Sequence, residues 1–286
     1  MAKLYLVLSV AIFGTVGVFV KYIPLPSAYI AAVRGAIGAL FMLGAILLKG
    51  RKPDRKAIRA NIKLLVFSGV CMGINWILLF QAYKYTSVAA ATLYYYLAPV
   101  FMIVLSPVLL HEKLTIGKLL CVAAAMLGVA AVSGVLGGEG LGSPLGALFG
   151  VSSAVFYAAC ILSSKFFKDI SSYDSTFVQL ICAAAVSLPY AVITGGEADL
   201  SDTRGIVMLI IVGLIHTGVA YYLYFYALSK LPGQTVALFS YVDPAVAVIL
   251  SMTLLREPMT VSGVVGAVLI LGSTVAGELL DRKPAG

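Results

Sequence analysis

Residues 82–115 read AYKYTSVAAATLYYYLAPVFMIVLSPVLLHEKLT, and residues 227–260 read ALSKLPGQTVALFSYVDPAVAVILSMTLLREPMT. The two stretches align without a gap at an offset of 145 residues. Each contains Tyr-x-x-Pro, with the prolines at Pro99 and Pro244, followed by Leu-Leu-x-Glu and, three residues after the glutamate, by threonine. Two apolar segments would not share a proline and a glutamate at one spacing by chance, so the pattern indicates an internal duplication.

Composition places this duplication in a membrane. Hydrophobic residues make up 61% of the 286-residue chain and charged residues 11%, against about 25% charged residues in an average soluble domain. One helical crossing of a bilayer takes about 20 apolar residues, so ten crossings use nearly the whole chain. The predicted spans are 4–21, 27–48, 64–84, 87–110, 115–135, 145–167, 174–194, 205–229, 232–255 and 260–280.

The duplication divides these spans into two sets of five, in residues 1–135 and 145–280, joined by the glycine-rich run Leu136 to Pro144. An odd number of helices per repeat turns the second copy upside down in the membrane. We therefore predict an all-α integral membrane protein of ten transmembrane helices, built as two inverted five-helix repeats. Such repeats create a binding site near the middle of the bilayer, where the copies meet.

Basic residues give the predicted orientation. Seven of the twenty lie between Lys49 and Lys63, and with the N-terminus inside, fifteen fall on the inner side and four on the outer side. Because positive charge is retained on the cytoplasmic side, both termini should be cytoplasmic in a protein of the cytoplasmic membrane. The net charge of +8 has its source in these loops and does not indicate a nucleic-acid partner.

Several short stretches carry a resemblance to a known family. They are Arg34, Ala82-Tyr83-Lys84-Tyr85-Thr86-Ser87, Leu97-x-Pro99, and Leu109-Leu110-x-Glu112-Lys113-Leu114-Thr115. Together they resemble the EamA-type branch of the drug/metabolite transporter superfamily. The resemblance implies ten helices, a central cavity between the repeats and transport by alternating access. It also implies a small-molecule substrate, since many bacterial members export amino acids or other metabolites and others import solutes.

Ionisable side chains inside spans are the strongest functional candidates, because a charge there costs about 3 kcal/mol or more. Asp243 is the deepest acid, and its repeat counterpart is Ala98. It can take up a proton, bind a substrate ammonium group, or only cap backbone groups that Pro244 leaves free. His216, also near the middle of its span, is either a proton carrier or a packing residue. Arg34 either binds a substrate carboxylate or clamps helix-end carbonyl groups.

Two prolines predict interruptions of the fourth and ninth spans. Pro99 and Pro244 each free a carbonyl four residues earlier, those of Tyr95 and Ser240. A freed carbonyl persists in a membrane only where it faces protein or a water-filled cavity. The two spans should therefore line the pathway and bend at these prolines.

Aromatic and amide side chains complete the predicted site. Adjacent helical residues point about 100° apart, so three consecutive tyrosines cannot all face one cavity. On the face of Asp243 the repeat alignment favours Tyr94 and Tyr95 over Tyr96. The alternative role for tyrosines in these spans is an aromatic belt at the membrane interface. Asn75 shares a helix face with the counterpart of His216, and Trp76 adjoins it. The predicted substrate-binding residues are Arg34, Asn75, Trp76, Tyr94, Tyr95, His216, Ser240 and Asp243, with coupling through Asp243 and His216 and hinges at Pro99 and Pro244.

The predicted function is export of a small metabolite, an amino acid or related compound, by a secondary transporter that can couple to protons. Import of a cationic or zwitterionic solute and multidrug efflux are the alternatives. No metal or cofactor is expected, because the four cysteines lack ligand spacing and no nucleotide-binding signature follows a strand. Two histidines without nearby acidic pairs argue against an enzyme, and charges in mid-span argue against an inert scaffold.

Cysteine labelling tests the orientation. Gly140→Cys, in the joint between the halves, should react with an impermeant thiol reagent in intact cells, because an odd number of crossings separates it from a cytoplasmic N-terminus. Lys52→Cys, in the basic loop, should react only after permeabilisation. The opposite pattern would reverse the topology.

Overall fold

The computed structural model describes residues 1–20, 22–86, 88–132, 143–194, 196, 201–254 and 261–282, and these ranges contain helices and no strand. The joint at 136–142 and Glu257 of the repeated motif lie outside them. The helices are α1 (Ala2–Val20), α2 (Ser27–Leu48), α3 (Arg55–Tyr85), α4 (Val88–Tyr95), α5 (Ala98–Leu110), α6 (Ile116–Val132), α7 (Pro144–Ser164), α8 (Ser172–Thr194), α9 (Thr203–Ile211), η2 (Val212–Val219), α10 (Ala220–Leu228), α11 (Gly233–Phe239), α12 (Val242–Leu254) and α13 (Val261–Arg282).

Most of these helices are long and apolar enough to cross a bilayer. Within the described ranges eight segments meet that condition, and Ile116–Ala131 is a shorter apolar helix. The eight segments are Ala2–Val20, Ser27–Leu48, Arg55–Tyr85, Ala90–Leu110, Pro144–Ser164, Ser172–Thr194, Thr203–Leu228 and Val261–Leu280. This confirms an all-α, multi-pass membrane protein. The other stretch predicted to cross, 232–255, contains the two short helices α11 and α12.

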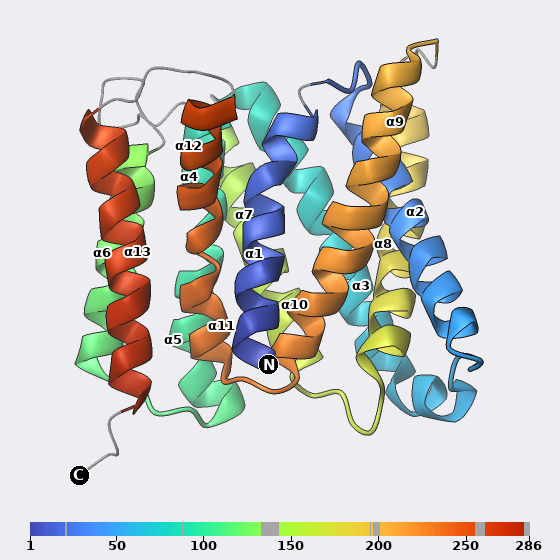
Figure 1. Cartoon of the computed structure of the whole chain (residues 1–286), viewed down its shortest axis with the longest axis horizontal. Helices are drawn as coiled ribbons and strands as arrows, with labels where there is room; N and C mark the ends of the chain where they lie inside the picture. Colours follow the sequence, from blue (N-terminus) through green and yellow to red (C-terminus); the bar gives the residue numbers. More distant parts are fainter. Residues whose placement is uncertain are drawn as a thin grey trace.

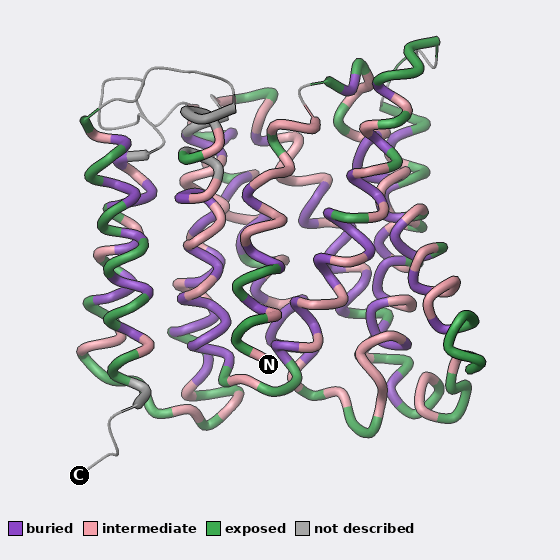
Figure 2. Tube along the Cα trace, viewed as in Figure 1, coloured by how far each residue is buried: buried purple, intermediate pink, exposed green. Residues whose placement is uncertain are grey.

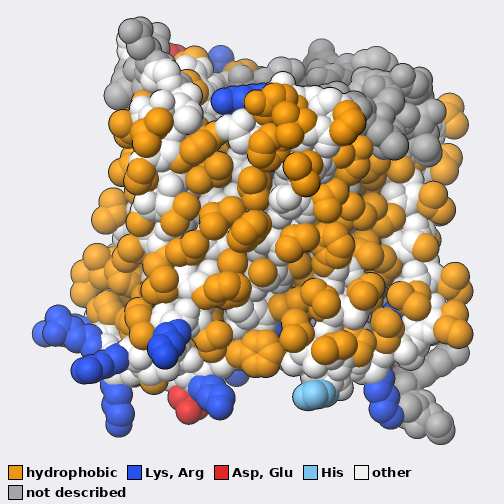
Figure 3. Space-filling model, turned by 180° about the vertical axis from the view of Figure 1, so that it is seen from behind, with side chains coloured by type: hydrophobic (Ala, Val, Ile, Leu, Met, Phe, Trp, Pro, Cys, Tyr) orange, Lys and Arg blue, Asp and Glu red, His pale blue; other side chains and the backbone are white. Residues whose placement is uncertain are grey.

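The helices stand side by side, and the start of α1 and the end of α13 lie at the same end of the bundle, which we call the terminal end (Figure 1). The opposite end is called the far end. Seen from behind, hydrophobic side chains cover the broad middle of the molecule, and most of the visible Lys and Arg gather along the terminal edge (Figure 3). An apolar belt with a basic margin is the surface that a bilayer requires.

The third helix differs from the prediction at its start. It begins at Arg55, whereas the sequence predicted a span from 64. The Asp54 carboxylate accepts hydrogen bonds from the backbone N–H groups of Lys56 and Ala57, and an aspartate in this position starts a helix efficiently. The first two turns carry basic side chains that hydropathy alone cannot assign to a span, although the backbone there is helical.

Three predicted spans are interrupted helices. The chain leaves helical geometry at Tyr96–Leu97 between α4 and α5, and at Ser240–Tyr241 between α11 and α12. The first interruption ends one residue before Ala98-Pro99, at Leu97, and the second ends at Tyr241, three residues before Pro244. The predicted span 205–229 contains an eight-residue π-helix between α9 and α10. Neither hydropathy nor the repeat pattern indicated this π-helix, an element that often marks a functional site.

Glycines allow the closest contacts in the bundle. Helix α3 packs along α7 and α8, and at Gly69 a Cβ atom would lie 2.5 Å from Cβ of Cys182 and 2.7 Å from the backbone oxygen of Gln179. Both atoms belong to a rigid helix, so neither can move away easily. Small residues of this kind let membrane helices approach each other without lipid between them.

The close contact gives a stability prediction. Gly69→Ala should lower the free energy of unfolding by about 1–3 kcal/mol, the usual effect of overpacking. Gly44→Ala in α2 is the matched control, because a Cβ there meets no atom within 4 Å. Thermal unfolding of the detergent-purified proteins measures the difference. Equal melting temperatures for the two variants would contradict the packing of α3 on α8.

Candidate functional site

The centre of the site is the carboxyl group of Asp243, in the first turn of α12 directly after the Ser240–Tyr241 interruption. It lies within electrostatic range of Tyr96 at the other interruption. Among the described residues it has no cationic partner. The residue as a whole is half-buried.

Tyr95, which lies within electrostatic range of this carboxylate, begins a chain of neighbouring hydroxyl-bearing side chains. The rings of Tyr95 and Tyr157 lie 5.4 Å apart. The Tyr157 hydroxyl donates to the Tyr224 hydroxyl at 3.3 Å, which lies 3.4 Å from the hydroxyl of Ser240. These side chains come from α4, α7, α10 and the α11–α12 interruption, so elements from both halves of the chain meet at one point.

A second charge stands on the other side of the cluster. The Arg34 guanidinium of α2 lies 4.4 Å from the centre of the Trp76 ring. Trp76 in turn packs edge-on against Tyr221, with ring centres 6.2 Å apart. No carbonyl or carboxylate among the described residues binds Arg34, and its buried Nε has no hydrogen-bond partner there. This arrangement does not show the predicted clamp to helix-end carbonyls.

Two tyrosines connect the opposite charges. Tyr83 and Tyr221 each lie within electrostatic range of both Arg34 and Asp243. The cation and the anion therefore share tyrosine neighbours, and no salt bridge joins them among the described residues. Tyrosine presents an aromatic face together with a hydrogen-bonding hydroxyl, so these side chains can contact an apolar group as well as charged ends.

His216 occupies a different position. It lies in the π-helical segment η2, and its Nε2 is 2.7 Å from the Thr15 hydroxyl of α1. The Thr15 hydroxyl also lies 2.7 Å from the Ile12 carbonyl, its acceptor. Thr15 donates its only hydroxyl proton to the Ile12 carbonyl, so the Nε2–H group of His216 donates to the Thr15 oxygen. The ring is further packed against Phe19 at 4.7 Å, so His216 joins α1 to η2 beside the tyrosine cluster.

Two other predicted side chains are engaged in helix contacts. The Asn75 amide donates to the backbone oxygen and to the hydroxyl of Ser153, both at 2.8 Å, and the Ser153 hydroxyl donates back to the Asn75 carbonyl. Tyr94 packs closely on α7. A Cβ atom added at Gly150 of α7 would lie 2.6 Å from the Cβ atom of Tyr94. Asn75 would have to give up bonds between α3 and α7 before it could bind a substrate.

The prediction preferred Tyr94 and Tyr95 to Tyr96 on the face of Asp243. Tyr95 and Tyr96 both lie within electrostatic range of the Asp243 carboxyl, whereas Tyr94 packs against α7. The prediction counted 100° per residue through a continuous helix. The interruption at Tyr96–Leu97 changes that phase, so the helical face of Tyr96 could not be obtained by counting.

Packing is uneven around the site. On its terminal side, side chains are almost fully enclosed (Figure 2); they include Leu6, Val10, Met102, Ile103, Leu228, Val236, Leu238 and Tyr241. At the level of the site, Arg34, Tyr83, Tyr95, Tyr157 and Asp243 are only partly buried. Among the described residues around the site, those on the terminal side are therefore the more closely packed.

Polar contacts reinforce this closely packed side. The Glu112 carboxylate, which follows α5, accepts the backbone N–H groups of Gly233 and Gln234 at 2.6 and 3.0 Å and so caps α11. Lys118 and Ser106 bind the Gln234 side chain at 2.9 and 2.6 Å. The first turn of α11 is thus tied to α5 and α6.

A lysine after α7 holds the neighbouring helix end. The Lys165 ammonium donates to the carbonyls of Leu228 and Leu231 at 2.9 and 2.6 Å. Burial lowers the pKa of Lys165, and the charge of Glu112 partly offsets that shift. Three elements that meet at the terminal end are therefore linked through charged side chains.

Sequence comparison identifies the scaffold. The profile of the EamA-like transporter family matches residues 1–134 and 144–276. The chain belongs to the EamA-like transporter family. An EamA-like protein is a transporter, which confirms the membrane and non-enzymatic parts of the prediction.

Relatives of this EamA-like chain are named as transporters. It is 32% identical to the uncharacterized transporter YxxF of Bacillus subtilis (strain 168), over 87% of this chain and 80% of that protein. It is 26% identical to an uncharacterized transporter of Archaeoglobus fulgidus, over 94% and 93% of the two chains. One solved crystal structure superposes with a TM-score of 0.86 at 20% identity, covering 99% of both chains, and shows that the fold is shared.

Sequence reasoning did not place Tyr83, Tyr96, Tyr157, Tyr221 and Tyr224 in the site. A signal for some of them existed, because tyrosine is enriched in the fourth and eighth spans. The same enrichment also fits an aromatic belt at the membrane interface. Only the position of each ring in the bundle distinguishes the two interpretations.

The Glu112 cap gives a testable prediction. Glu112→Gln should lower the free energy of unfolding by about 1–3 kcal/mol, because hydrogen bonds to a charged group are stronger than neutral ones. Lys113→Gln is the control, since the exposed Lys113 side chain neighbours Glu112 in sequence but has no partner among the described residues. Thermal unfolding in detergent is the measurement. Loss of stability in the control but not in Glu112→Gln would refute the cap.

Proposed function

We propose that this protein is a secondary transporter that exports a small zwitterionic metabolite, an amino acid or a related compound, across the cytoplasmic membrane. The observation that carries the proposal is the pair of charges at Arg34 and Asp243, which share one cluster of tyrosines. Among the described residues neither side chain has a partner of opposite charge.

Energetics favour a ligand with both charges. An ionised side chain inside a membrane protein costs about 3 kcal/mol or more unless it is compensated. A substrate ammonium group at Asp243 and a substrate carboxylate at Arg34 would compensate both charges in one binding event. A cation alone would leave Arg34 uncompensated, and an anion alone would leave Asp243 uncompensated.

The aromatic lining supports a compact organic substrate. Trp76 already lies under the Arg34 guanidinium, and an aromatic face adds about 0.5–2 kcal/mol to the binding of a nearby cation. Tyr95, Tyr157 and Tyr221 supply both apolar faces and hydroxyls. The hydroxyls can orient the polar ends of a substrate while the rings contact its side chain.

Asp243 also supplies a route to coupling and direction. One carboxylate can hold a proton or a substrate ammonium group, but not both with full affinity. Because the proton and the substrate compete for this carboxylate, each transport cycle exchanges a proton for a substrate molecule. Where the proton gradient points inward, protons entering on Asp243 drive the substrate outward, and His216 beside the cluster is the second candidate for proton transfer.

Alternating access follows if the two halves are inverted repeats of five crossings each, residues 1–135 and 145–280, with α11–α12 as the ninth crossing. Interhelical contacts support this division. If each helix is replaced by its counterpart in the other half, the α3·α7 contact corresponds to α10·α1, α3·α8 to η2·α2, and α5·α7 to α12·α1. All of these helix pairs are in contact. Further support comes from the family profile, which matches each half.

The interrupted helices supply the moving parts in this proposal. α4 lies toward the far end together with α12, and α5 lies toward the terminal end together with α11 (Figure 1). Bending at Pro99 and Pro244 would then open one side of the site as it closes the other. The packed terminal side and the partly accessible site fit a state closed toward the terminal end, which the basic loops assign to the cytoplasm.

The test is a binding and transport experiment with substrates that differ in one charge. Purified protein is screened by ligand-induced thermal stabilisation with neutral amino acids, with the matching amines and with the matching carboxylic acids. Zwitterions should stabilise the protein and the single-charge analogues should not. Asp243→Asn and Arg34→Gln should each weaken binding by roughly 2–5 kcal/mol, the effect of leaving one member of a buried charge pair alone.

Transport in proteoliposomes tests coupling. Asp243→Asn should abolish substrate flux driven by a pH gradient. Asp169→Asn is the control, because Asp169 is exposed at the terminal end and its φ of 49° is one that Asn adopts readily. Normal binding and normal driven flux in Asp243→Asn would refute the proposal. If the protein binds amines that lack a carboxylate, and Arg34→Gln leaves that binding unchanged, the result would favour efflux of organic cations.

A further inference from the structure

Basic side chains gather at one corner of the terminal end, around the connection between α2 and α3. This connection lies at the outer edge of the bundle (Figure 1), and the view from behind shows Lys and Arg side chains at that corner (Figure 3). Six basic residues there are exposed, and none forms an ion pair within the described part of the chain. We call them the basic corner: Arg51, Lys52, Arg55, Lys56, Arg59 and Lys63.

The acids of this region leave the charge uncompensated. The Asp54 carboxylate accepts two backbone N–H groups at the start of α3. Asp174 of α8 accepts the Ser171 hydroxyl at 2.7 Å and the backbone N–H of Asp54 at 3.4 Å. Asp169, in the connection between α7 and α8, forms no ion pair with a described residue. Six cations therefore face three carboxylates that are engaged elsewhere or stand apart, and the corner carries an excess of positive charge.

Helix α3 carries this charge straight into the apolar belt. Positions 55, 59, 62 and 66 follow the spacing of one helix face, and Arg55, Arg59, Ile62 and Val66 are all exposed. A second exposed row runs beside it through Lys56, Lys63 and Phe67. Arg59 and Ile62 are separated by only about 4.5 Å along the helix axis. Each row changes from cationic to apolar within one turn, as a helix does where it passes through phospholipid headgroups.

The end of α2 adds a second apolar surface and a rigid support. Leu47 and Leu48 are exposed and directly precede Lys49. The Lys49 ammonium donates to the Tyr173 hydroxyl at 2.7 Å and lies 4.3 Å from the centre of that ring. The Tyr173 ring in turn lies 4.2 Å from the ring of Tyr222. The connection between α2 and α3 is thereby held on α8 and α10, so its cations are presented from a fixed frame.

We propose that the basic corner binds the headgroup of an anionic phospholipid in the leaflet at the terminal end, with acyl chains along the exposed apolar side chains of α2 and α3. The predicted orientation makes this the cytoplasmic leaflet, where anionic lipids attract basic segments. The inference is independent of the transported substrate and of Arg34 and Asp243.

Two features of the corner favour a lipid over solvated charges that only set the orientation. Retention of positive charge on one side of a membrane requires basic residues in a loop, and it does not require them to continue exposed apolar rows on a helix. Arg55 and Lys56 also occupy the first turn of α3, where the helix dipole disfavours cations. An anionic headgroup beside them relieves that cost, and its acyl chains cover Ile62, Val66 and the neighbouring leucines, which a soluble anion cannot do.

Lipid titration of the full-length protein in a neutral detergent tests the proposal. Thermal stabilisation is recorded as phosphatidylglycerol or phosphatidylcholine is added in mixed micelles, at low and at high salt. Phosphatidylglycerol should stabilise the protein at lower concentration than phosphatidylcholine. High salt should reduce the difference, because the exposed charges are then screened.

The matched variants are Arg55→Gln with Arg59→Gln, and Lys113→Gln with Lys230→Gln. Both pairs remove two positive charges, and Lys113 and Lys230 are exposed in connections outside the corner. One basic residue near an anionic surface contributes about fivefold in affinity. The Arg55/Arg59 variant should therefore bind phosphatidylglycerol about 25-fold more weakly than wild type, and the control pair within about twofold of it. Without lipid, the Arg55/Arg59 variant should be at least as stable as wild type, since Arg55 leaves the start of a helix.

Three results would overturn the proposal. Wild-type protein could respond equally to the two lipids. The two variants could lose the response to phosphatidylglycerol equally, which would make the corner a solvated charge cluster. Soluble glycerol phosphate could stabilise the protein as well as phosphatidylglycerol does, which would assign the corner to a soluble anion. None of these results involves substrate binding, so the proposed transport function stands or fails separately.

Discussion

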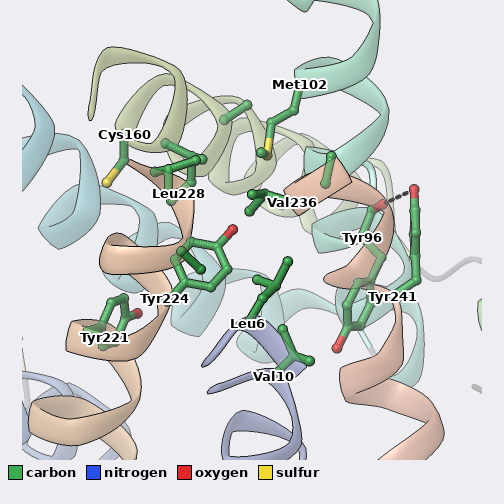
Figure 4. Packing of buried hydrophobic residues seen from close by; sticks show 14 of the residues in the cluster. Leu6, Val10, Tyr96, Met102, Cys160, Tyr221, Tyr224, Leu228, Val236 and Tyr241 are labelled. Carbon is green, nitrogen blue, oxygen red and sulfur yellow. Dashed lines mark hydrogen bonds between the residues drawn. The ribbon is translucent and has the colours of Figure 1, made fainter. Parts of the chain in front are cut away.

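A carbonyl group that leaves a helical hydrogen bond inside a bilayer finds no water, and the loss costs several kcal/mol unless another group binds it. This protein contains two such interruptions, and a side chain from one binds a backbone carbonyl of the other. The Tyr241 hydroxyl donates to the carbonyl of Tyr96 (Figure 4). The interruptions are tolerated because the halves lie against each other, and so the fold and the site depend on the same contacts.

The two halves differ in their charged residues. The scaffold offers equivalent positions at residues 98 and 243, but only the second carries a carboxylate. Arg34 likewise corresponds to Gln179, whose amide donates to Ser68 and Ser164 in a buried polar cluster. A duplicated framework thereby holds one cation and one anion in a fixed relation, which is what recognition of an asymmetric small molecule requires.

The terminal side of the bundle combines two means of closure. Enclosed aliphatic side chains pack on the terminal side of the site, and charged side chains hold the helix ends around it. Glu112 is bonded to the first two N–H groups of α11, a helix whose residues Gly233–Leu238 are all buried. Movement of α11 would have to break charge-assisted bonds and expose apolar surface together. Such a barrier favours two discrete states over gradual leakage.

Sequence alone determined the membrane class, the helix-rich fold and the approximate ends of the spans, because hydropathy reports directly on the length of chain that lipid can surround. The repeated motif further located both interruptions, since proline cannot donate a backbone hydrogen bond. The chemistry of Asp243 and Arg34 could also be anticipated, because charges are rare inside apolar spans. These features are local, and each is written in a short stretch of residues.

Only the tertiary structure decided which side chains meet. Tyr94 and Tyr96 are two residues apart and of the same type, yet one packs on α7 and the carbonyl of the other accepts the Tyr241 hydroxyl. Asn75 and His216 were predicted as substrate-binding residues, and each is bonded to a neighbouring helix. The rotational phase of a helix changes at every interruption or π-turn, and it is fixed by packing against distant segments. For that physical reason the polar residues of the site could be predicted by type, while their partners could not.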